Sequence, residues 1–361
     1  MKRMFNLEKL FLNVFKPKKG ETVLVMYDFP KQDKPNREWS LRIEMAKDWL
    51  EKLKDLENKI GIKVNQILKY KATGSKNAPL PDKCFLDNNE VSFDEVLSKA
   101  DIVFAMTEFS ATAPLIFATE RFSFRAASMP GVSKSMERTS LAADYERVAE
   151  RCSLVKNKLK DAVGAKVVFN ADGKKFEMFF DLRNRTAEED NGRCWEPKTI
   201  INLPSGETYI VPYEGESEKF GKSKTKGQIP FIKNNELVVF EVDENKVTTI
   251  KGNGRLFDSM IRFFNVDKAR RNMAELGVGC NEWAIISGSV LEDEKVEGIH
   301  IAYGLSKHLG GITDISSFKS KENVVHEDMV YPRNGNVKIN ILKIIKENKE
   351  EDLIKDGSFI F

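Results

Sequence analysis

The first half of the chain alternates short apolar runs with longer segments in which apolar residues recur at helical spacing. Strands are predicted where compact apolar runs are bounded by Gly or Pro, as in ETVLVMYDF at 21–29, and helices where the period lengthens. The predicted strands are 21–29, 61–70 and 101–109, and the predicted helices are 37–56, 92–100, 115–127 and 144–163. This order predicts an α/β domain with an open, mostly parallel sheet and helices on its faces.

A hairpin marks the change of pattern in the middle of the chain. AKVVFNADGKKFEMFFDLRNR (165–185) contains two strand-like runs around an Asp172-Gly173 turn, which is typical of a β-hairpin. A polar stretch at 186–194 follows it. The domain boundary is therefore predicted near residue 190, which divides the chain into domains 1–190 and 191–361.

The second domain is expected to be α+β with a mixed or antiparallel sheet. Its apolar runs are short and separated by turn residues, and one helix at 256–274 interrupts them. The tail at 338–357 is charged and amphipathic, so it is expected to be a solvated surface element. The predicted strands of this domain are TIINLP, ETYIVPYE, ELVVFEV, KVTTIKG and GIHIAYG.

Composition narrows the class of protein. Among 361 residues, 58 Lys and Arg against 55 Asp and Glu leave a net charge of +3, which gives no electrostatic case for nucleic-acid binding. The four cysteines are scattered and form no CxxC motif, so they are expected to be reduced structural thiols. No apolar run approaches the ~20 residues of a membrane span, and the start of the chain reads as an amphipathic helix rather than a signal peptide. A cytoplasmic protein without membrane association is expected.

The three histidines all lie between residues 300 and 326. His300 occupies the predicted strand GIHIAYG, while His326 and Asp328 are two residues apart, so in an extended chain both side chains leave the same face. Two imidazoles and one carboxylate can form a mononuclear Fe(II) site or half of a two-metal hydrolase site. The alternatives are a core histidine with one hydrogen bond and a surface His–Asp pair.

Two glutamates and the third histidine are further candidates for metal binding or catalysis. Glu207 follows a Pro-Ser-Gly turn at the head of a predicted strand, where it could reach a cation or simply be solvated. Glu275 is predicted at a helix C-terminus, where the helix dipole disfavours an acid unless a cation compensates. His308 is expected in a loop, either with a structural role or as a substrate contact or proton shuttle.

Four short motifs follow one another in the second half: NLPSGE, AELGVG, LEDEKVEGIHIAYG and HEDM. In this order they resemble the thermophilic metalloprotease family of aminopeptidases, which includes aminopeptidase T and aminopeptidase S. The earlier segments SATAPLIFATERFSFRAASMPG and DYERVAERCSLVKNKLKDA are also similar to that family. The resemblance implies a homodimeric enzyme that releases N-terminal amino acids from peptides with two divalent metal ions (Zn, Co or Mn). The implied metal ligands are Glu207, Glu275, His300, His326 and Asp328.

The sequence departs from the family pattern at one catalytic position. The family has a tyrosine a few residues after the HIALG-type segment, whereas this chain has Lys307 and His308 there and Tyr303 earlier. Tyr303 or His308 is expected to take its role of steadying the oxyanion, with Glu275 as proton acceptor or bridging ligand.

Two other functions stay open from the resemblance. The related 2,5-dihydroxypyridine dioxygenases use one Fe(II) ion, for which His300, His326 and Asp328 would be the ligands. A relative that kept the fold and lost the chemistry could bind peptides without cleaving them. The presence of both Glu207 and Glu275 favours two metals, because a single-iron site does not need them.

Overall fold

The computed structural model describes residues 4–30 and 36–360, so residues 1–3 of the predicted N-terminal helix lie outside the described part. The chain divides into two compact units. Unit 1 contains Met1–Glu150, Asp190–Gly206 and Asn281–Lys295, and unit 2 contains Arg151–Glu189, Glu207–Cys280 and Val296–Phe361. The chain passes from one unit to the other at several points. One of these points lies near residue 190, where the sequence predicts a boundary, and no sequence pattern indicated the others.

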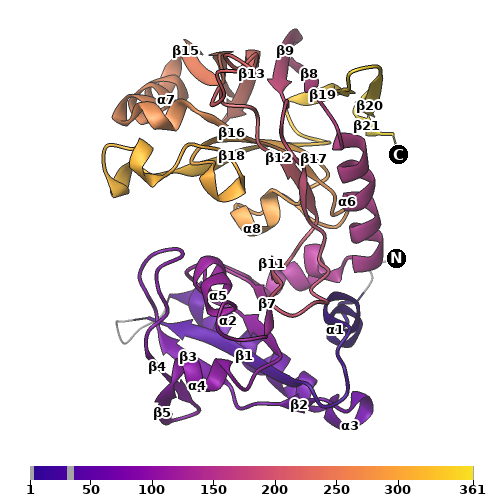
Figure 1. Ribbon diagram of the computed structural model, residues 1–361, viewed down its shortest axis with the longest axis vertical. Helices are drawn as coiled ribbons and strands as arrows, with labels where there is room; N and C mark the ends of the chain where they lie inside the picture. Colours follow the sequence, from indigo (N-terminus) through magenta and orange to yellow (C-terminus); the bar gives the residue numbers. More distant parts are fainter. Residues whose placement is uncertain (1–3, 31–35, 361) are drawn as a thin grey trace. The chain divides into compact units, whose positions relative to one another are not determined.

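Within the described residues, unit 1 is built on an eight-stranded sheet (Figure 1). The strand order is β11-β7-β6-β1-β3-β4-β5, with β2 also paired to β1. All pairs are parallel except those that β4 makes with β3 and β5. The mostly parallel sheet is therefore confirmed. The strands are β1 (Thr22–Phe29), β2 (Lys63–Val64), β3 (Leu68–Lys71), β4 (Lys83–Leu86), β5 (Asn89–Ser92), β6 (Ile102–Ala105), β7 (Arg125–Ser128) and β11 (Ile200–Asn202).

Strand β11 was expected in the second domain, but it joins this first sheet. It runs parallel to β7, with Ile200 opposite Ala126 and Asn202 opposite Ser128. A three-residue apolar run contains no local pattern that predicts which strand it pairs with, because strand pairing is a contact between distant parts of the chain. The assignment of TIINLP to the second sheet was wrong for this reason.

Helices cover both faces of the parallel sheet. Val23 and Val25 of β1 join the core under α1 and α2, whereas Leu24 and Met26 join the core under α4 and α5. Because both faces are buried, β1 is a continuous apolar run rather than an alternating one. The helices of unit 1 are α1 (Leu7–Phe15), α2 (Arg37–Lys54), α3 (Glu57–Ile60), α4 (Phe93–Leu97) and α5 (Thr112–Ala118), with short 3₁₀ turns η1 (Lys134–Arg138) and η2 (Ser140–Ala142). Helix α6 (Tyr145–Leu159) begins in unit 1 and continues into unit 2.

Unit 2 contains a large antiparallel sheet of order β15-β14-β13-β9-β8-β19-β20-β21. The predicted hairpin is confirmed as β8 and β9, which pair from Gly164–Asp181 to Ala171–Lys174 around the Asp172-Gly173 turn. The strands are β8 (Gly164–Ala171), β9 (Lys174–Asp181), β13 (Lys226–Lys233), β14 (Glu236–Asp243), β15 (Lys246–Gly252), β19 (Lys338–Ile345), β20 (Glu350–Lys355) and β21 (Ser358–Phe359).

The prediction of a solvated surface element at 338–357 was wrong. Strand β19 pairs with β8 along its length and buries Ile339, Leu342 and Ile344. The β19–β8 register shifts between Ile339 and Ile341. Because of this irregularity, the buried residues Ile339 and Leu342 are three positions apart in the sequence. Such spacing is typical of a helix, whereas a regular strand buries every second residue.

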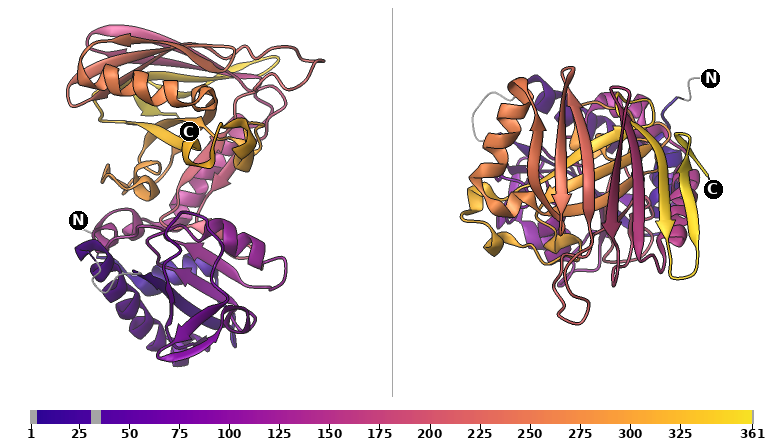
Figure 2. Two further views of the ribbon diagram at one scale, coloured as in Figure 1. Left: turned by 90° about the vertical axis from the view of Figure 1, so that its left-hand side faces the viewer. Right: turned by 90° about the horizontal axis from the view of Figure 1, so that it is seen from above.

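A smaller sheet of order β10-β12-β16-β17-β18 packs against the large one. The ring of Tyr331 in the smaller sheet lies 5.3 Å from that of Phe169 in the large sheet, and the ring of Tyr303 lies 4.9 Å from that of Phe264, which belongs to the helix at Gly254–Val266. The two sheets of unit 2 appear as stacked layers in Figure 2. The strands are β10 (Glu188–Asp190), β12 (Glu207–Ile210), β16 (Met273–Gly279), β17 (Gly298–Gly304) and β18 (His326–Pro332).

The predicted helix at 256–274 is shorter than expected. Helix α7 spans Gly254–Val266, the 3₁₀ turn η3 spans Lys268–Arg271, and β16 begins at Met273. Glu275 therefore lies inside a fully buried strand and not at a helix end. The remaining short helices are α8 (Val290–Asp293), η4 (Lys307–Leu309), η5 (Ile315–Ser317) and η6 (Lys321–Asn323).

Within residues 4–30 and 36–360, none of the helices combines the length and the apolar character that crossing a bilayer requires. The four cysteines all lie in this described part, where each is buried and free of a disulfide. They pack as small apolar side chains, as the sequence indicated.

Candidate metal centre

The register of the smaller sheet places the five predicted ligands on one face. Glu207 is paired with Gly279, Gly277 with His300, and Glu275 with Ala302, whose other partner is Asp328. Paired residues of an antiparallel sheet project to the same side, and every second residue along a strand does so too. The residues that share this face are Glu207, Glu275, His300, His326 and Asp328.

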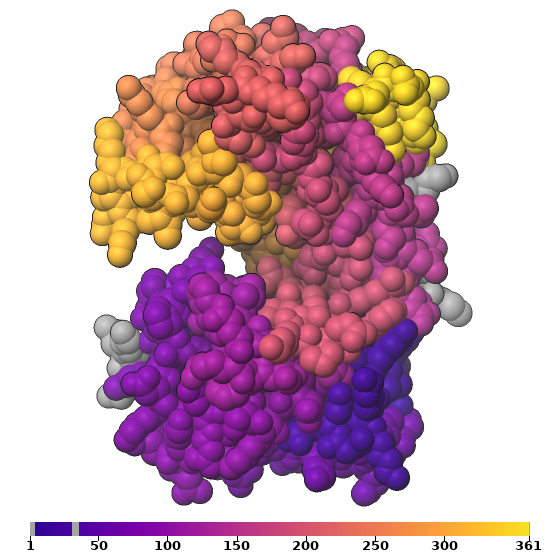
Figure 3. Space-filling view, in the orientation of Figure 1, coloured from indigo at the N-terminus to yellow at the C-terminus, as the bar shows by residue number. Residues whose placement is uncertain are grey.

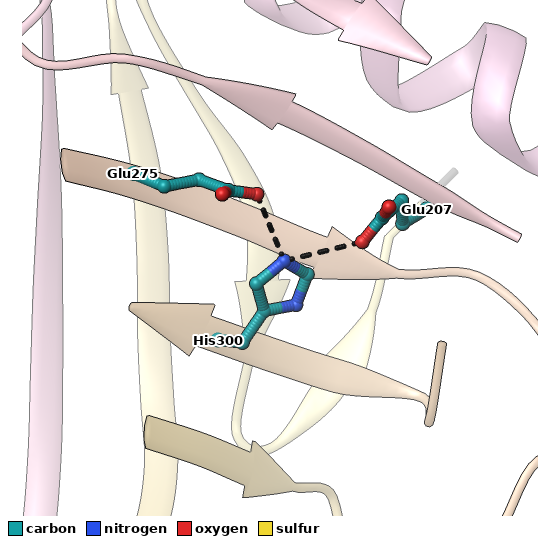
Figure 4. Close-up of side chains that lie close together, drawn as sticks. All are labelled: Glu207, Glu275 and His300. Carbon is teal, nitrogen blue, oxygen red and sulfur yellow. Dashed lines mark hydrogen bonds and ion pairs between the residues drawn. The ribbon is translucent and has the colours of Figure 1, made fainter. Parts of the chain in front are cut away.

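Glu275 lies between the two imidazoles and gives one carboxylate oxygen to each. Its Oε1 lies 3.1 Å from His300 Nε2, and its Oε2 lies 3.1 Å from His326 Nε2. His300 Nε2 also lies 3.3 Å from Glu207 Oε2 (Figure 4). The ligand atoms form two compact groups that share Glu275, namely Glu207–Glu275–His300 and Glu275–His326–Asp328, with all atoms of a group within 4.8 Å of one another.

These separations fit ligands of a common metal ion. Nitrogen and oxygen ligands bound at about 2.0–2.1 Å lie roughly 3.0–3.4 Å from one another in octahedral or tetrahedral sites, and the measured 3.1–3.3 Å falls in that range. His326 Nδ1 lies 2.7 Å from the carbonyl oxygen of Leu305 and must donate to it. In a neutral imidazole the Nε2 lone pair then faces the Glu275 carboxylate. Two acceptors so placed need a proton or a cation between them.

The charge state of this buried cluster follows from the same contacts. Burial disfavours the charged form of His300, but its hydrogen bond to Glu275 and the charges of Glu207 and Asp328 raise its pKa to about 10. The protein around the half-buried His326 also disfavours its charged form, yet Glu275 and Asp328 raise its pKa to about 9. Burial alone would raise the pKa of Glu275, whereas hydrogen bonds from both imidazoles hold it well below its usual range. Without a metal, two imidazolium protons compensate the carboxylates.

A glycine makes room for the first imidazole. A Cβ atom on Gly277 would lie 1.8 Å from His300 Nε2 and 2.3 Å from its Cε1. The side chain of His300 therefore lies directly over the backbone of the neighbouring strand. Any larger residue at position 277 would push the imidazole out of the cluster. The AELGVG motif therefore contributes two things to the site, the carboxylate of Glu275 and the space above Gly277.

The two predicted oxyanion residues have different positions. Tyr303 lies on the opposite face of β17, where its hydroxyl donates to Glu327 at 3.1 Å and its ring packs on Phe263 and Phe264. The side-chain period of two along the strand separates it from His300, so this arrangement does not bring Tyr303 to the ligand face. His308 does reach the cluster: its ring lies 4.9 Å from the ring of His326 at an interplanar angle of 82°.

His308 is neutral at physiological pH. The residue is exposed, but the protein around its ring disfavours the charged imidazolium, and the nearby charge of His326 adds to this effect. The pKa of His308 is lowered to about 4. A neutral imidazole beside the cluster can accept or donate one hydrogen bond to a bound molecule.

The loop that carries His308 is held by Glu214, a residue that the sequence did not single out. One Glu214 oxygen accepts from Ser306 Oγ at 2.5 Å and from the Ile312 N–H at 3.2 Å, and the other accepts from Thr313 Oγ1 at 2.6 Å. A Cβ on Gly311 would collide with the same carboxylate. Glu214 follows strand β12 in a polar segment without a motif, so no local signal could have identified it.

Comparisons with known proteins show a shared fold. No family model and no curated protein matches the sequence. The 2,5-dihydroxypyridine dioxygenase from Pseudomonas putida KT2440 aligns over 98% of this chain and 96% of its own, with a TM-score of 0.64 and 15% identity. Wild-type AmpT from Thermus thermophilus aligns over 99% of both chains, with a TM-score of 0.56 and 12% identity. Identities this low establish a distant relationship in fold, and membership of the aminopeptidase family stays a prediction.

Gly277→Ala is expected to weaken metal binding by about 10–100-fold, the size of effect seen when a ligand loses its orientation. The new methyl group would displace His300 from its place over the strand. Isothermal titration with Zn²⁺ or Co²⁺ measures the affinity. Gly173→Ala is the control, because a Cβ there meets nothing within 4 Å, and its positive φ of 71° costs only stability. Wild-type metal affinity in Gly277→Ala would contradict the assignment of His300 as a ligand.

Metal binding is expected to release about two protons at pH 7, because His300 and His326 are charged in the metal-free protein. Titrations in two buffers of different ionisation enthalpy measure this number. The apparent affinity should rise with pH until both histidines are neutral, near pH 9–10.

The metal-free protein should show the opposite trend in stability. Both folded-state pKa values are raised, so the stabilisation is complete below the unfolded value of about 6.5 and is lost as pH rises through 9 and 10. Urea unfolding from pH 6 to 10 after metal removal checks this. A metal affinity independent of pH would contradict the charged state of the two histidines.

Glu214→Ala is expected to release the loop and to return the pKa of His308 from about 4 toward the ordinary value of about 6.5. With only three histidines in the chain, a proton NMR titration of the metal-free protein can follow each imidazole. Glu218→Ala is the matched control, because Glu218 is exposed and makes no contact with the loop. A His308 pKa that stays near 4 in Glu214→Ala would show that other contacts hold the loop.

Proposed function

We propose that the protein is a two-metal aminopeptidase that releases N-terminal amino acids from peptides. The observation that carries this proposal is the position of Glu275, which gives one oxygen to each of two ligand groups. A carboxylate shared in this way is the ligand that joins two neighbouring ions. The fold shared with AmpT, an aminopeptidase, supports the same activity.

The ligand set assigns one group of residues to each ion. Glu207 and His300 would hold the first, His326 and Asp328 the second, and Glu275 both. Zn, Co and Mn all suit these ligands. Bound there, such ions supply Lewis acidity toward a peptide carbonyl and lower the pKa of water toward neutrality. The buried residues fix the ligand geometry before substrate arrives, because the strands and Gly277 leave them little freedom.

His308 is the residue that would act on the substrate from outside the ligand set. Its pKa of about 4 keeps the ring neutral at pH 7, so it can donate a hydrogen bond to a developing oxyanion or accept a proton. Of the two residues that the sequence offered for stabilising the oxyanion, Tyr303 and His308, we therefore assign this role to His308. In this proposal Glu275 is the shared ligand. Each of its two carboxylate oxygens contacts one ligand group, which favours this role over proton transfer.

A mononuclear Fe(II) ring-cleaving dioxygenase is the second candidate. The dioxygenase with the same fold favours it, and His300, His326 and Asp328 supply its ligand types. The geometry favours the first candidate, because each of the two compact groups contains only one histidine. Peptide substrates, a homodimer and a cytoplasmic location remain expectations.

The two candidates differ in what they require of Glu207. In the two-metal enzyme, Glu207→Gln should lower the bound metal from about two equivalents toward one and reduce hydrolysis of aminoacyl anilides and short peptides by at least about 100-fold. Elemental analysis and mass spectrometry of the released amino acid measure these quantities with Zn, Co or Mn. In the single-iron enzyme, Glu207→Gln should leave iron content unchanged.

Glu327→Gln is the matched control, because Glu327 lies between His326 and Asp328 in the chain but accepts from Tyr303 on the other face. It should keep metal content and activity. Oxygen uptake with Fe(II) and dihydroxylated pyridines or catechols would instead establish the second candidate. A protein that binds peptides but neither hydrolyses them nor consumes oxygen would show that both enzyme proposals are wrong.

A further inference from the structure

Unit 2 contains a cleft that shares no residue with the five candidate metal ligands, although its lining includes Thr313 of the loop anchored by Glu214. It has a volume of about 660 Å³ and lies between the start of β15, the 3₁₀ turn η3 and the loop that includes Thr313 and Ser317. The corresponding orange and gold segments adjoin at the molecular surface in Figure 3. Strand β15 is the edge strand of the large sheet, and at the cleft its first residue, Lys246, forms an isolated antiparallel bridge with Asn272, which follows η3. The volume of the cleft is within the range of small-molecule sites.

The cleft is lined by three cationic side chains and by no acidic one. Lys246, Lys268 and Arg271 contribute the positive charges. Within residues 4–30 and 36–360, none of the three has a carboxylate within 4.0 Å, whereas other basic residues nearby do: Lys251 is paired with Glu241 and Lys222 with Glu244. No ion pair therefore neutralises the three charges, and together they attract an anion to the cleft.

Acidic residues next to the lining residues make other contacts, such as Asp314, which accepts from Ser316. Asp267 precedes Lys268, but its carboxylate accepts from the N–H groups of Ala269 and Lys319 and from Asn323 Nδ2. Asp243 is opposite Lys246 in the strand register without forming an ion pair with it. None of these carboxylates neutralises the cleft.

Arg271 is held in place by neutral acceptors. Its Nη1 donates to the carbonyl of Val247 at 2.9 Å, and its Nη2 donates to Asn265 Oδ1 at 3.1 Å. These bonds orient the guanidinium and leave its charge intact. A fixed cation loses little conformational entropy when a ligand binds, and a guanidinium suits carboxylate and phosphate oxygens equally well.

We propose that this cleft binds a small anion with at least two negative charges, a polycarboxylate or a phosphate compound. Two exposed lysines and one oriented arginine match such a ligand in charge, and a monovalent anion would leave part of the positive charge uncompensated. The proposal does not depend on the function of the metal centre.

The test is isothermal titration of protein from which metal and chelator have been removed by dialysis. The probes are citrate, inorganic phosphate and pyrophosphate, with ionic strength held constant by KCl. Metal-free protein is required because citrate and pyrophosphate bind metal ions themselves. We expect saturable binding of citrate or of pyrophosphate at one site. Preference for citrate identifies a polycarboxylate ligand, and preference for phosphate or pyrophosphate identifies a phosphate ligand.

The double variant Lys246→Gln/Lys268→Gln should weaken this binding by about tenfold or more, because two of the three charges are lost. Both lysines are exposed, so the variant should fold, and its unfolding midpoint checks this. Lys233→Gln is the control: it removes an exposed lysine from β13 of the same sheet, outside the cleft, and should bind as the wild type does. Absence of saturable binding by all three probes, or unchanged binding in the double variant, would overturn the proposal.

Discussion

The smaller sheet of unit 2 depends on the electrostatic balance around Glu275. Three carboxylates and two imidazoles lie on one face of this sheet, where Glu275 is 5% and His300 1% exposed and where His326 and Asp328 are half-buried. Isolated charges in such a place would be strongly destabilising, so the carboxylates require protons on the histidines or cations between the ligands. This requirement explains why Glu275 reaches both imidazoles and why a change of metal content should change both stability and proton uptake.

The two faces of the sheet have separate tasks because side chains alternate along each strand. Along β17, His300 lies on the ligand face, whereas Ile299, Ile301 and Tyr303 are buried on the opposite face, where Tyr303 packs on α7. The ligand face has small residues between its ligands, above all Gly277, so that an imidazole can lie across the neighbouring strand. Packing rigidity on one face thus fixes the ligand geometry on the other.

The same fold serves a dioxygenase and AmpT, so the fold by itself does not choose the reaction. In this chain the choice depends on whether Glu207 and Glu275 hold a second ion beside the two histidines. The loop tied to Glu214 adds a neutral imidazole next to the cluster. The basic cleft is formed by β15, η3 and the segment from Thr313 to Ser317, and neither reaction requires the anion binding proposed for it.

The sequence by itself determined the features that depend on neighbouring residues. The βα order of the first half, the hairpin at 165–185 and the shared face of His326 and Asp328 follow from local periods and from the strand pleat. The sequence did not determine the strand position of Glu275, the place of β11 in the first sheet, the burial of β19 or the anchoring of His308 by Glu214. Each of these depends on pairing between distant segments, and no local pattern encodes the partner. The tertiary structure alone brought Glu207, Glu275 and His300 together, because their convergence is a consequence of strand register.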